Sequence, residues 1–486
     1  MKAVLKFAFF LSFIIEVKAQ LTTFSLTIKD TLNLYNYTSR AIEFPTGVYT
    51  LVGEGNGLSF SQGGYQQIYQ IDEQGNLLQK KINYDTTRRY FGDSKIIKTI
   101  DDNFLVSSTR TRLGGSGGNK IFVSKISPDL NDTLWTYLHS DSSYFDTTAD
   151  LFEADNGDVY VSARRRPFEN DSMLGVLICL NSVGQFVFEK TLRERKFQAH
   201  ESIVQLPDGN LILGGTRGPN NSNLVGFLMK INLDGEIISS QDYNEITECG
   251  ISLYDTSTII MSGYKFPNIR PKLLLINTGG SILQNKTYFT PGYSSQNYIG
   301  RKLSDGNIVS VGMTTKLDLS NNNDGFIMKT DSIGNLIWYK KYRYTDGDYV
   351  EYFIDFIETS DGGMLVSGVA GESFENGGQN SWLIKLDEDG CLNYENCEVS
   401  IEDALFPDLL TIYPNPISDW LRIDLNNYTA EYIVQLYDSF GFLVLQEKFI
   451  KTGTYSLSVE SLAKGIYYCR ILSNGEVVAF DKVIKF

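Results

Sequence analysis

The stretch IVQLPDGNLILGG, Ile203–Gly215, is followed by GFLMKINLDGEIISS, Gly226–Ser240. Each stretch holds two apolar segments joined by a tight polar turn, with the alternation and turn residues typical of β-strands. The same pair of stretches returns at intervals of roughly fifty residues, the length of one β-propeller blade with four strands. The repeat therefore predicts an all-β fold of the β-propeller type.

The turns show how often the pair returns. No long segment with helical periodicity interrupts it. Seven turns of a first kind, from the first stretch of the pair, and seven of a second kind, from the second stretch, predict a seven-bladed β-propeller over residues 20–397. The first kind falls at Thr46-Gly47, Asp102-Asn103, Asn156-Gly157, Asp208-Gly209, Thr256-Ser257, Asp305-Gly306 and Asp361-Gly362, and the second at Gly75, Asn131-Asp132, Gly184, Gly235, Gly280, Gly334 and Gly390.

The two ends of the repeat complement each other. The seventh pair ends at Cys391 without a clear fourth strand, whereas residues 23–28 form a strand-like segment before the first pair. An unpaired edge strand invites aggregation, so we expect the N-terminal strand to complete the last blade. Cys391 and Cys397 bracket a short loop at this point, and in an exported protein we expect them to form a disulfide.

The first nineteen residues have the features of a secretory signal peptide. Lys2 and Lys6 precede an apolar core, and Ala19 ends a small-residue cleavage site before Gln20. This core is too short for a permanent transmembrane helix, and the rest of the sequence offers no longer apolar segment, so we expect no transmembrane segment. The formal net charge of −15 opposes nucleic-acid binding, which requires cationic side chains at the phosphates.

After a linker at residues 398–408, residues 409–486 alternate apolar and polar side chains and predict a small Ig-like β-sandwich. This segment resembles the type A C-terminal sorting domain of the Bacteroidetes type IX secretion system. The resemblance implies recognition by the type IX secretion machinery and a location outside the cell or on its outer surface. It rests on Tyr413, Pro414, Asn415, Pro416, Gly441, Gly465, Tyr467, Lys482 and Lys485.

Residues with catalytic chemistry are sparse. The two histidines, His139 and His200, lie near Ser and Asp but without a G-x-S-x-G elbow. The sequence shows no cluster of His and Cys with zinc-site spacing, so we predict no metal and no cofactor. We therefore expect a binding protein rather than an enzyme. An extracellular polysaccharide hydrolase or lyase, or a structural surface component, stays as an alternative.

The loops that differ between blades carry basic and aromatic side chains. Such loops on a rigid scaffold are common recognition sites, and Arg and Tyr often anchor binding. An anionic glycan or an acidic protein would fit them, although the same side chains could instead pack between blades or pair with Asp and Glu. The candidate binding face contains Arg110, Arg112, Arg164, Arg165, Arg166, Arg217, Arg270, Lys272, Tyr144 and Tyr293.

Overall fold

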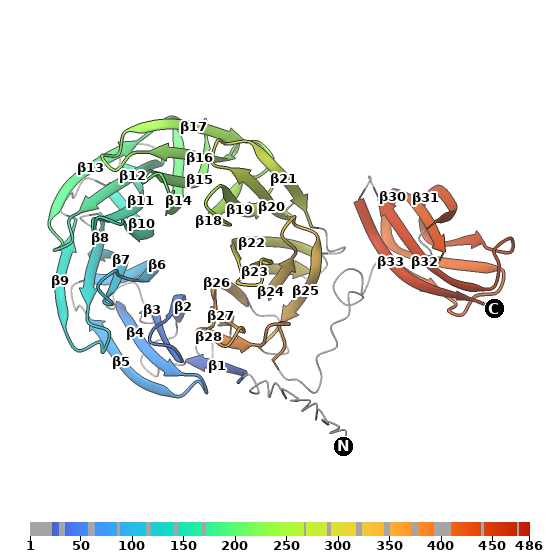
Figure 1. Cartoon of the computed structure of the whole chain (residues 1–486), viewed down its shortest axis with the longest axis horizontal. Helices are drawn as coiled ribbons and strands as arrows, with labels where there is room; N and C mark the ends of the chain where they lie inside the picture. Colours follow the sequence, from blue (N-terminus) through green and yellow to red (C-terminus); the bar gives the residue numbers. More distant parts are fainter. Residues whose placement is uncertain are drawn as a thin grey trace, which may run out of the picture.

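The computed structural model describes residues 22–28, 35–56, 64–84, 88–112, 118–139, 144–167, 172–266, 269–288, 293–316, 323–344, 350–371, 378–392, 410–438, 442–473 and 476–486. These residues form strands and turns, with no helix among them. Strands β1 to β28 make propeller-like sheets that stand side by side in a ring (Figure 1). The predicted signal peptide (residues 1–19, with Ala19 and Gln20 at its cleavage site), the linker (398–408), Cys397 and Gly441 lie outside the described residues.

Five of the sheets contain four antiparallel strands each, in chain order. Their strands are β6 (Arg88–Lys98), β7 (Phe104–Arg112), β8 (Asn119–Ile126) and β9 (Thr133–Leu138); β10 (Tyr144–Glu153), β11 (Val159–Pro167), β12 (Leu174–Leu180) and β13 (Phe186–Leu192); β14 (Phe197–Gln205), β15 (Leu211–Gly218), β16 (Val225–Ile231) and β17 (Ile237–Tyr243); β18 (Glu248–Leu253), β19 (Thr258–Tyr264), β20 (Pro271–Asn277) and β21 (Ile282–Thr287); and β22 (Tyr293–Lys302), β23 (Ile308–Lys316), β24 (Asn323–Thr330) and β25 (Leu336–Tyr342).

An eight-stranded sheet joins the two ends of the ring. Its order is β26-β27-β28-β2-β3-β4-β5, and β1 also pairs with β28. The link between β28 and β2 is one parallel bridge, Tyr35 to Gln379, whereas β1 pairs with β28 from Phe24 opposite Lys385 to Ile28 opposite Ser381. The predicted completion by the N-terminal strand is therefore confirmed. The strands are β1 (Phe24–Ile28), β2 (Tyr35–Glu43), β3 (Val48–Asn56), β4 (Gly64–Asp72), β5 (Leu77–Tyr84), β26 (Tyr352–Glu358), β27 (Met364–Gly371) and β28 (Gln379–Leu386).

The Asp/Gly turns of the repeat have a common conformation. Gly209 adopts φ 82°, a left-handed value that glycine tolerates best, and the Asp208 carboxylate accepts a hydrogen bond from Asn210 N at 3.0 Å. Asp102 holds the same position in its own turn at φ 60°, as a non-glycine residue. Since Asp and Asn side chains bond nearby backbone groups in such turns, the polar residues of the repeat are explained by the turns themselves.

The lysine that recurs in the second half of the repeat binds the aspartate of the first-half turn. The Lys230 ammonium lies 2.6 Å from Asp208, and Lys329 lies 2.9 Å from Asp305. Lys125 with Asp101 and Lys385 with Asp361 repeat the pair at 2.9 and 2.8 Å. The lysine near the end of the alternating pattern therefore connects the third strand of a sheet to the turn between its first and second strands.

Neighbouring sheets are joined by a second recurring contact. The carboxylate of Glu153, near the end of β10, accepts a hydrogen bond from Ile100 N in the preceding sheet at 2.6 Å. Glu358 accepts one from Ser304 N at 2.7 Å in the same way. Glu43 accepts one from Ser360 N at 2.7 Å, across 317 residues of sequence. The two ends of the ring thus meet through the contact that joins its successive sheets.

The outermost strands make a third contact with the next sheet. The hydroxyls of Tyr243, Tyr288 and Tyr342 donate to the carbonyls of Gly280, Gly334 and Gly390 at 2.9, 2.8 and 2.7 Å. Phe24 of β1 packs over Gly75 in the corresponding place, where a Cβ on the glycine would lie 3.3 Å from the ring. The N-terminal strand therefore acts as an outermost strand toward its neighbour as well as within its own sheet.

The hydrophobic core of the ring lies between the faces of adjacent sheets. Tyr160 and Leu177 of one sheet pack with Leu213 and Phe227 of the next, all buried. A further cluster joins Tyr49 and Tyr69 to Leu365 and Leu383, with Phe24, Leu26 and Ile28 of β1 packed against it. Because apolar burial is the main stabilising term, each sheet depends on both of its neighbours.

The C-terminal residues form a five-stranded sheet with its own core. The order is β29-β30-β32-β33, with β31 paired to β30, and a register shift between Leu425 and Ala430 divides the long β30. Leu421, Val434, Leu457 and Cys469 are fully buried in a cluster of this segment. The strands are β29 (Leu410–Tyr413), β30 (Trp420–Asp438), β31 (Leu443–Ser458), β32 (Gly465–Ser473) and β33 (Glu476–Lys485).

Deleting residues 20–29 should lower the melting temperature of the mature protein sharply. The deletion exposes the edge of β28 and removes Phe24, Leu26 and Ile28 from their cluster. Circular dichroism during heating measures the effect, and a synthetic peptide of residues 20–29 should restore part of the loss. An unchanged melting temperature would show that the ring does not depend on β1.

Candidate functional site

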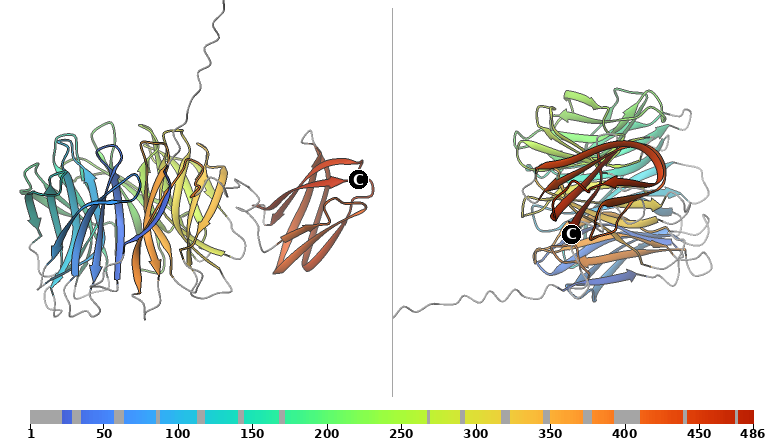
Figure 2. Two further views of the ribbon diagram at one scale, coloured as in Figure 1. Left: turned by 90° about the horizontal axis from the view of Figure 1, so that it is seen from below. Right: turned by 90° about the vertical axis from the view of Figure 1, so that its right-hand side faces the viewer.

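The ring has two different faces, because antiparallel strands place alternate connections at opposite ends. We call the face with the turns between first and second and between third and fourth strands the turn face. The opposite face, with the connections between second and third strands and between sheets, is the loop face. Figure 2 shows the strands running from one face to the other. The candidate basic and aromatic residues belong to strand ends near the loop face.

Arg165 is used inside the protein. Its side chain is 4% exposed and donates to Asp146 at 2.7 and 2.8 Å and to Glu189 at 2.5 and 3.1 Å. The guanidinium also lies 4.5 Å from the ring centre of Tyr144. His139 Nε2 completes the cluster 2.5 Å from the Glu189 carboxylate. Burial opposes the charged form of Glu189, but hydrogen bonds from His139 and Arg165 outweigh it and lower its pKa to about 2.

Arg217 also makes its contacts inside the protein. It forms ion pairs with Glu194 and Asp242, donates to Ser240 Oγ at 2.7 Å and lies over the Phe227 ring. Its side chain is 3% exposed. The charges of Arg165 and Arg217 are therefore paired with acidic residues inside the ring, which is the alternative that the sequence left open.

The remaining candidate residues are distributed over the loop face. Arg164 forms an ion pair with Glu201 and lines the central pocket described below. The Arg110 guanidinium lies 4.9 Å from the ring centres of both Tyr90 and Phe122. Arg166 is exposed, Arg270 and Lys272 are partly buried, Tyr293 accepts a hydrogen bond from Lys341, and the Arg112 side chain lies outside the described part of the structure.

A recurring β-bulge turns side chains into the centre of the ring. The strands nearest the centre in Figure 1 are β2, β6, β10, β14, β18, β22 and β26. Their pairing shifts register just before Arg40 in β2, Asp150 in β10 and Asp355 in β26. Because a bulge re-aims the side chains beside it, the same irregularity presents a polar residue to the centre from several sheets. Lys95, Ser202 and Ile299 follow the shifts in β6, β14 and β22.

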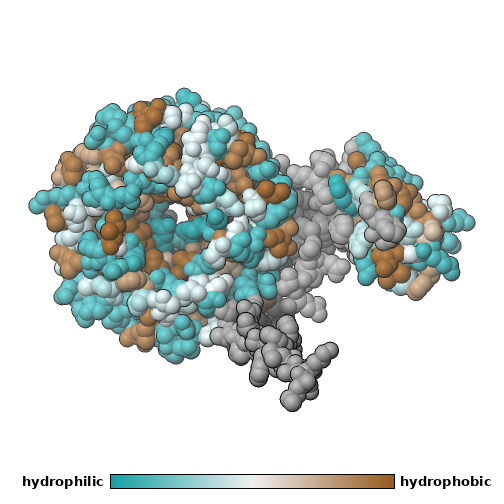
Figure 3. All heavy atoms as spheres, viewed as in Figure 1, coloured by the Kyte–Doolittle hydropathy of each residue, from teal (hydrophilic) through white to brown (hydrophobic). Residues whose placement is uncertain are grey.

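These side chains line a central pocket of about 510 Å³. Figure 3 shows the hollow at the centre of the ring, bordered by hydrophilic residues. The volume is within the range of small-molecule sites, which are concave and carry a few well-placed polar groups. The lining includes Tyr37, Arg40, Lys95, Asp150, Arg164, Glu201, Glu248, Tyr264, Asn297, Tyr298, Arg301, Tyr352 and Asp355.

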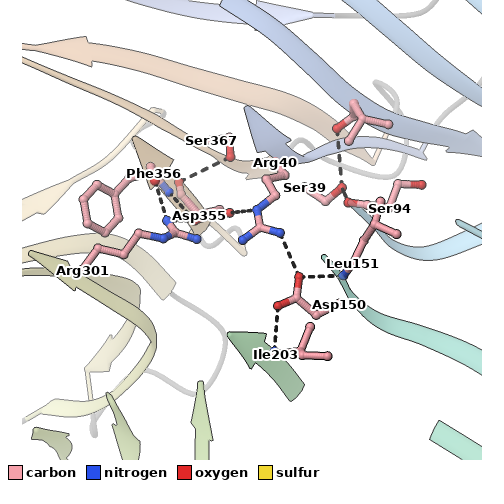
Figure 4. Close-up of polar contacts among 11 residues, drawn as sticks. Ser39, Arg40, Ser94, Asp150, Leu151, Ile203, Arg301, Asp355, Phe356 and Ser367 are labelled. Carbon is pink, nitrogen blue, oxygen red and sulfur yellow. Dashed lines mark hydrogen bonds and ion pairs between the residues drawn. The ribbon is translucent and has the colours of Figure 1, made fainter. Parts of the chain in front are cut away.

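Two arginines and two aspartates form a chain of ion pairs across this pocket. The Arg40 guanidinium lies 2.9 Å from Asp150 of β10 and 3.1 Å from Asp355 of β26, and Arg301 of β22 pairs with the same Asp355 (Figure 4). Asp150 also accepts a hydrogen bond from Ile203 N at 3.1 Å. The chain of contacts thus links five innermost strands, β22, β26, β2, β10 and β14, which belong to four sheets.

The ion pairs favour the charged forms of Arg40 and Asp355. Burial opposes the charged form of Arg40, but Asp150 and Asp355 outweigh it and hold its pKa above the ordinary value. Burial likewise opposes ionisation of Asp355, but Arg301 and Arg40 outweigh it and lower the pKa of that carboxyl. A carboxyl group with a lowered pKa is a poor general acid at neutral pH.

Tyrosines lie on the loop-face side of this charged layer. Tyr37 and Tyr352 precede Arg40 and Asp355 in their strands, and the rings of Tyr298 and Tyr352 meet edge to face at 6.3 Å. Burial, followed by the neighbouring Glu248, raises the pKa of Tyr264, so its hydroxyl stays protonated. The pocket therefore offers aromatic rings near its mouth and paired charges deeper in the ring.

The second histidine is buried. Burial, with the nearby charges of Arg164 and Arg217, lowers the pKa of His200 to about 3, and the ring contacts the ring of Phe227. A Cβ at Gly175 would lie 2.0 Å from His200 Nε2, so this glycine makes room for the imidazole. Neither histidine is placed beside a serine nucleophile by the contacts of the described residues.

The sequence contains a signal for the pocket that the repeat alone does not reveal. Arg40, Asp150 and Asp355 each stand seven positions before the left-handed turn residue Gly47, Gly157 or Gly362. A charged residue at this place in an innermost strand is unusual, because unpaired charges are rarely buried. Comparing this one position across the repeats would have identified Arg40, Lys95, Asp150 and Asp355, but not the other charged residues of the pocket.

The residues of the C-terminal motif hold its last strand in place. Asn415 donates to the Lys482 carbonyl at 2.7 Å and accepts from Ile484 N at 3.0 Å. The buried Lys485 donates to the Ser418 carbonyl, and Tyr467 donates to the Ala463 carbonyl at 2.7 Å. Tyr413 donates to Asp424 at 3.0 Å, whereas Pro414, Pro416, Gly465 and Lys482 are exposed.

Among the residues that the structure describes, no group of three or more His, Cys, Asp or Glu side chains is arranged to hold a metal ion. Cys391 is disulfide-bonded, and because Cys397 lies outside the described residues, their pairing stays a prediction. Cys179 and Cys249 are free and buried, and Cys469 is also buried. In the same part of the chain, no helix has the length and apolar character needed to span a membrane.

Comparison with known proteins identifies the C-terminal domain. Residues 411–485 match the family model of the secretion system C-terminal sorting domain. The chain therefore carries a type IX C-terminal sorting domain, as the resemblance indicated. It is handled by the type IX secretion machinery and is exported to the cell surface or secreted. The search of curated proteins found no match.

Solved structures similar to this chain include β-propellers. The β-propeller domain of the Trilobed protease from Pyrococcus furiosus is 10% identical, with a TM-score of 0.40 over 72% of this chain and 94% of that one. The α-L-arabinofuranosidase arb93a from Fusarium graminearum is 9% identical, with a TM-score of 0.42 over 76% and 99%. A protein of unknown function from Bacteroides caccae is 14% identical, with a TM-score of 0.37 over 57% and 89%. Likeness at this level concerns the fold and carries no argument about activity.

Replacing Arg40 with methionine should destabilise the protein by about 3–5 kcal/mol, because it leaves Asp150 and Asp355 without a shared cation in a buried site. Urea unfolding measures the change. Arg195→Met is the matched control, since Arg195 is half exposed and pairs with Asp242, a pair expected to contribute less than about 1 kcal/mol. Equal effects of the two substitutions would show that the central ion pairs do not hold the ring.

His200 should make the protein less stable as the pH falls. In the unfolded chain it takes up a proton near its ordinary pKa of 6.5, whereas in the folded protein its pKa is about 3. Between these values the unfolded state binds more protons, so His200 lowers the unfolding free energy by up to about 1.4 kcal/mol per pH unit. Urea unfolding at several pH values should show a shallower acid slope for His200→Gln. If the unfolding free energies of the two proteins change with pH in parallel, the low pKa of His200 in the folded protein is contradicted.

Proposed function

We propose that this chain is an exported seven-bladed β-propeller that acts as a binding module, delivered by an Ig-like C-terminal β-sandwich. The blade number is supported by the eight-stranded sheet, which divides at the single bridge between Tyr35 and Gln379 into β2–β5 and β26–β28 with β1. The sandwich is supported by the two halves of β30, which pair with different partners around one core.

The central pocket is the observation that carries the binding role. Its volume of about 510 Å³ is sufficient for a small ligand or the end of a larger one. Its walls come from strands of all the sheets, and the ion pairs of Arg40 hold several of these strands together. A site on rigid strands is already formed before the ligand arrives, which reduces the entropic cost of binding.

The loop face is a second surface for recognition of an anionic glycan or an acidic protein. Arg165 and Arg217 do not support this partner, because their charges are paired and buried. Arg166 and Lys196 support it better: both are exposed and line a cavity of about 450 Å³ with Phe197. A basic and aromatic cavity of this kind would complement a negatively charged partner.

Hydrolysis in the central pocket is less well supported. Glycosidases of the usual type need one carboxyl group that stays protonated and a second that is ionised. The pKa of Asp355 is lowered, and Glu201 is paired with Arg164. These features favour binding without turnover, and they direct the experiment toward ligands rather than products.

The mature chain, residues 20–486, should bind a subset of immobilised glycans in a glycan-array screen. Ile354→Trp should abolish this binding, because Ile354 lines the pocket and the larger side chain would fill it. Arg195→Ala, outside the pocket, is the matched control, and melting temperatures confirm that each variant is folded.

The same incubation mixtures are analysed for reducing ends and unsaturated products. Product formation that Ile354→Trp removes would favour the enzyme. If no glycan binds, or if Ile354→Trp binds like the unmodified chain, the pocket is not the binding site that we propose.

A further inference from the structure

We infer that the central pocket binds the uncharged end of a polyhydroxylated ligand, a neutral saccharide rather than an anionic one. This inference rests on the proposed function and specifies the ligand of the same pocket. It departs from the preference for an anionic glycan that the basic loops suggest. Three properties of the described pocket lead to it: its charge balance, the arrangement of its polar groups and its tyrosines.

The first property is that the charges of the pocket are balanced, and that six of its eight charged residues form ion pairs with one another. Four cationic side chains in the lining face four carboxylates. Arg40 is bound to Asp150 and Asp355, Arg301 to Asp355, and Arg164 to Glu201. An anionic ligand would have to compete with these carboxylates for the same guanidinium groups, leaving a buried carboxylate without its partner, which is costly. The cationic residues are Arg40, Lys95, Arg164 and Arg301, and the carboxylates are Asp150, Glu201, Glu248 and Asp355.

The second property is that donors and acceptors stand side by side in fixed positions. A guanidinium has five N–H donors, and each carboxylate oxygen can accept more than one hydrogen bond. An Arg–Asp pair such as Arg40 with Asp150 therefore keeps donor and acceptor capacity after the two groups have bound each other. Each hydroxyl of a saccharide both donates and accepts, so neighbouring hydroxyls match such a pair without disturbing its charge balance.

The third property is the set of tyrosines near the mouth. Tyr37, Tyr298 and Tyr352 lie on the loop-face side of the charged layer, and Tyr264 adds a fourth aromatic ring to the lining. A tyrosine presents an apolar face and a polar edge, as does a sugar ring. Aromatic rings at the mouth can pack against the C–H face of a sugar while its hydroxyls reach the ion pairs.

The position of the ion pairs indicates that the pocket receives an end of the ligand. Asp150, Arg40, Asp355 and Arg301 form a continuous chain of contacts across the centre, from β10 through β2 and β26 to β22 (Figure 4). A ligand that enters from the loop face contacts the tyrosines first and the ion pairs next. Because the ion pairs lie across the centre beyond the tyrosines, the pocket suits a terminal sugar unit better than a long polymer that passes through the ring.

Isothermal titration calorimetry of the mature chain with neutral oligosaccharides and with oligosaccharides of uronic acids tests the inference. We expect the neutral series to bind. Its affinity should change less than about twofold between about 0.05 and about 0.5 M NaCl, because no net charge is neutralised. Tyr298→Ala and Tyr352→Ala should each weaken binding by about tenfold, as is common for an aromatic anchor.

Matched variants separate the pocket from the loop face. Tyr298→Phe and Tyr352→Phe keep the ring and should retain most of the affinity, whereas Arg195→Ala, which lines neither cavity, should leave it unchanged. Melting temperatures show whether an alanine variant is folded. If Tyr352→Ala fails to fold, the phenylalanine variants and Tyr298→Ala still test the site.

Two results would overturn the inference in different ways. Binding confined to uronic acid oligosaccharides, with a steep salt dependence and loss in Arg166→Ala, would move the site to the loop face and leave the proposed binding role intact. No binding of either series, together with no glycan on the array, would overturn the inference and the proposed function together.

Discussion

The ring depends on its closure. Each sheet buries its faces against two neighbours, so a ring with one open end would expose a complete apolar face. Pairing of β1 with β28 removes the open edge, and Glu43 bound to Ser360 connects the end of β2 to the turn between β26 and β27 across the junction. Phe24 over Gly75 completes the contact at the outer rim. The first and last described strands of the ring therefore stabilise all those between them.

The same closure explains the central ion pairs. Arg40 belongs to β2, at the junction, and reaches both β10 and β26. Charges in a largely buried site are costly unless they are paired, so the permanently charged Arg40 is accommodated here because the complete ring places Asp150 and Asp355 beside it. The pocket and the ring consequently depend on each other, because the residues that would contact a ligand also connect the innermost strands.

The repeat was sufficient to predict the strands, the turns and the partner of the N-terminal strand. Apolar alternation marks strands locally, and residues such as Gly209 and Asp208 mark turns because few residue types adopt those backbone conformations. The C-terminal motif was equally informative, since Asn415 and Lys485 bind backbone groups that only a particular strand arrangement supplies. For the loops, the role of the basic residues in binding stays a prediction. Arg165 and Arg217 have the side chains of a binding surface, yet their acidic partners lie on other strands and bury them.

The sequence by itself determined the repeat, the all-β character and the export domain, because each of these depends on residues close together in the chain. Only the tertiary structure decided which charged residues meet at the centre. Arg40 and Asp355 are separated by most of the ring in sequence, and the bulges that aim Asp150 and Asp355 inward depend on the register of paired strands. A position in one strand becomes part of a pocket only when all the innermost strands converge around the same axis.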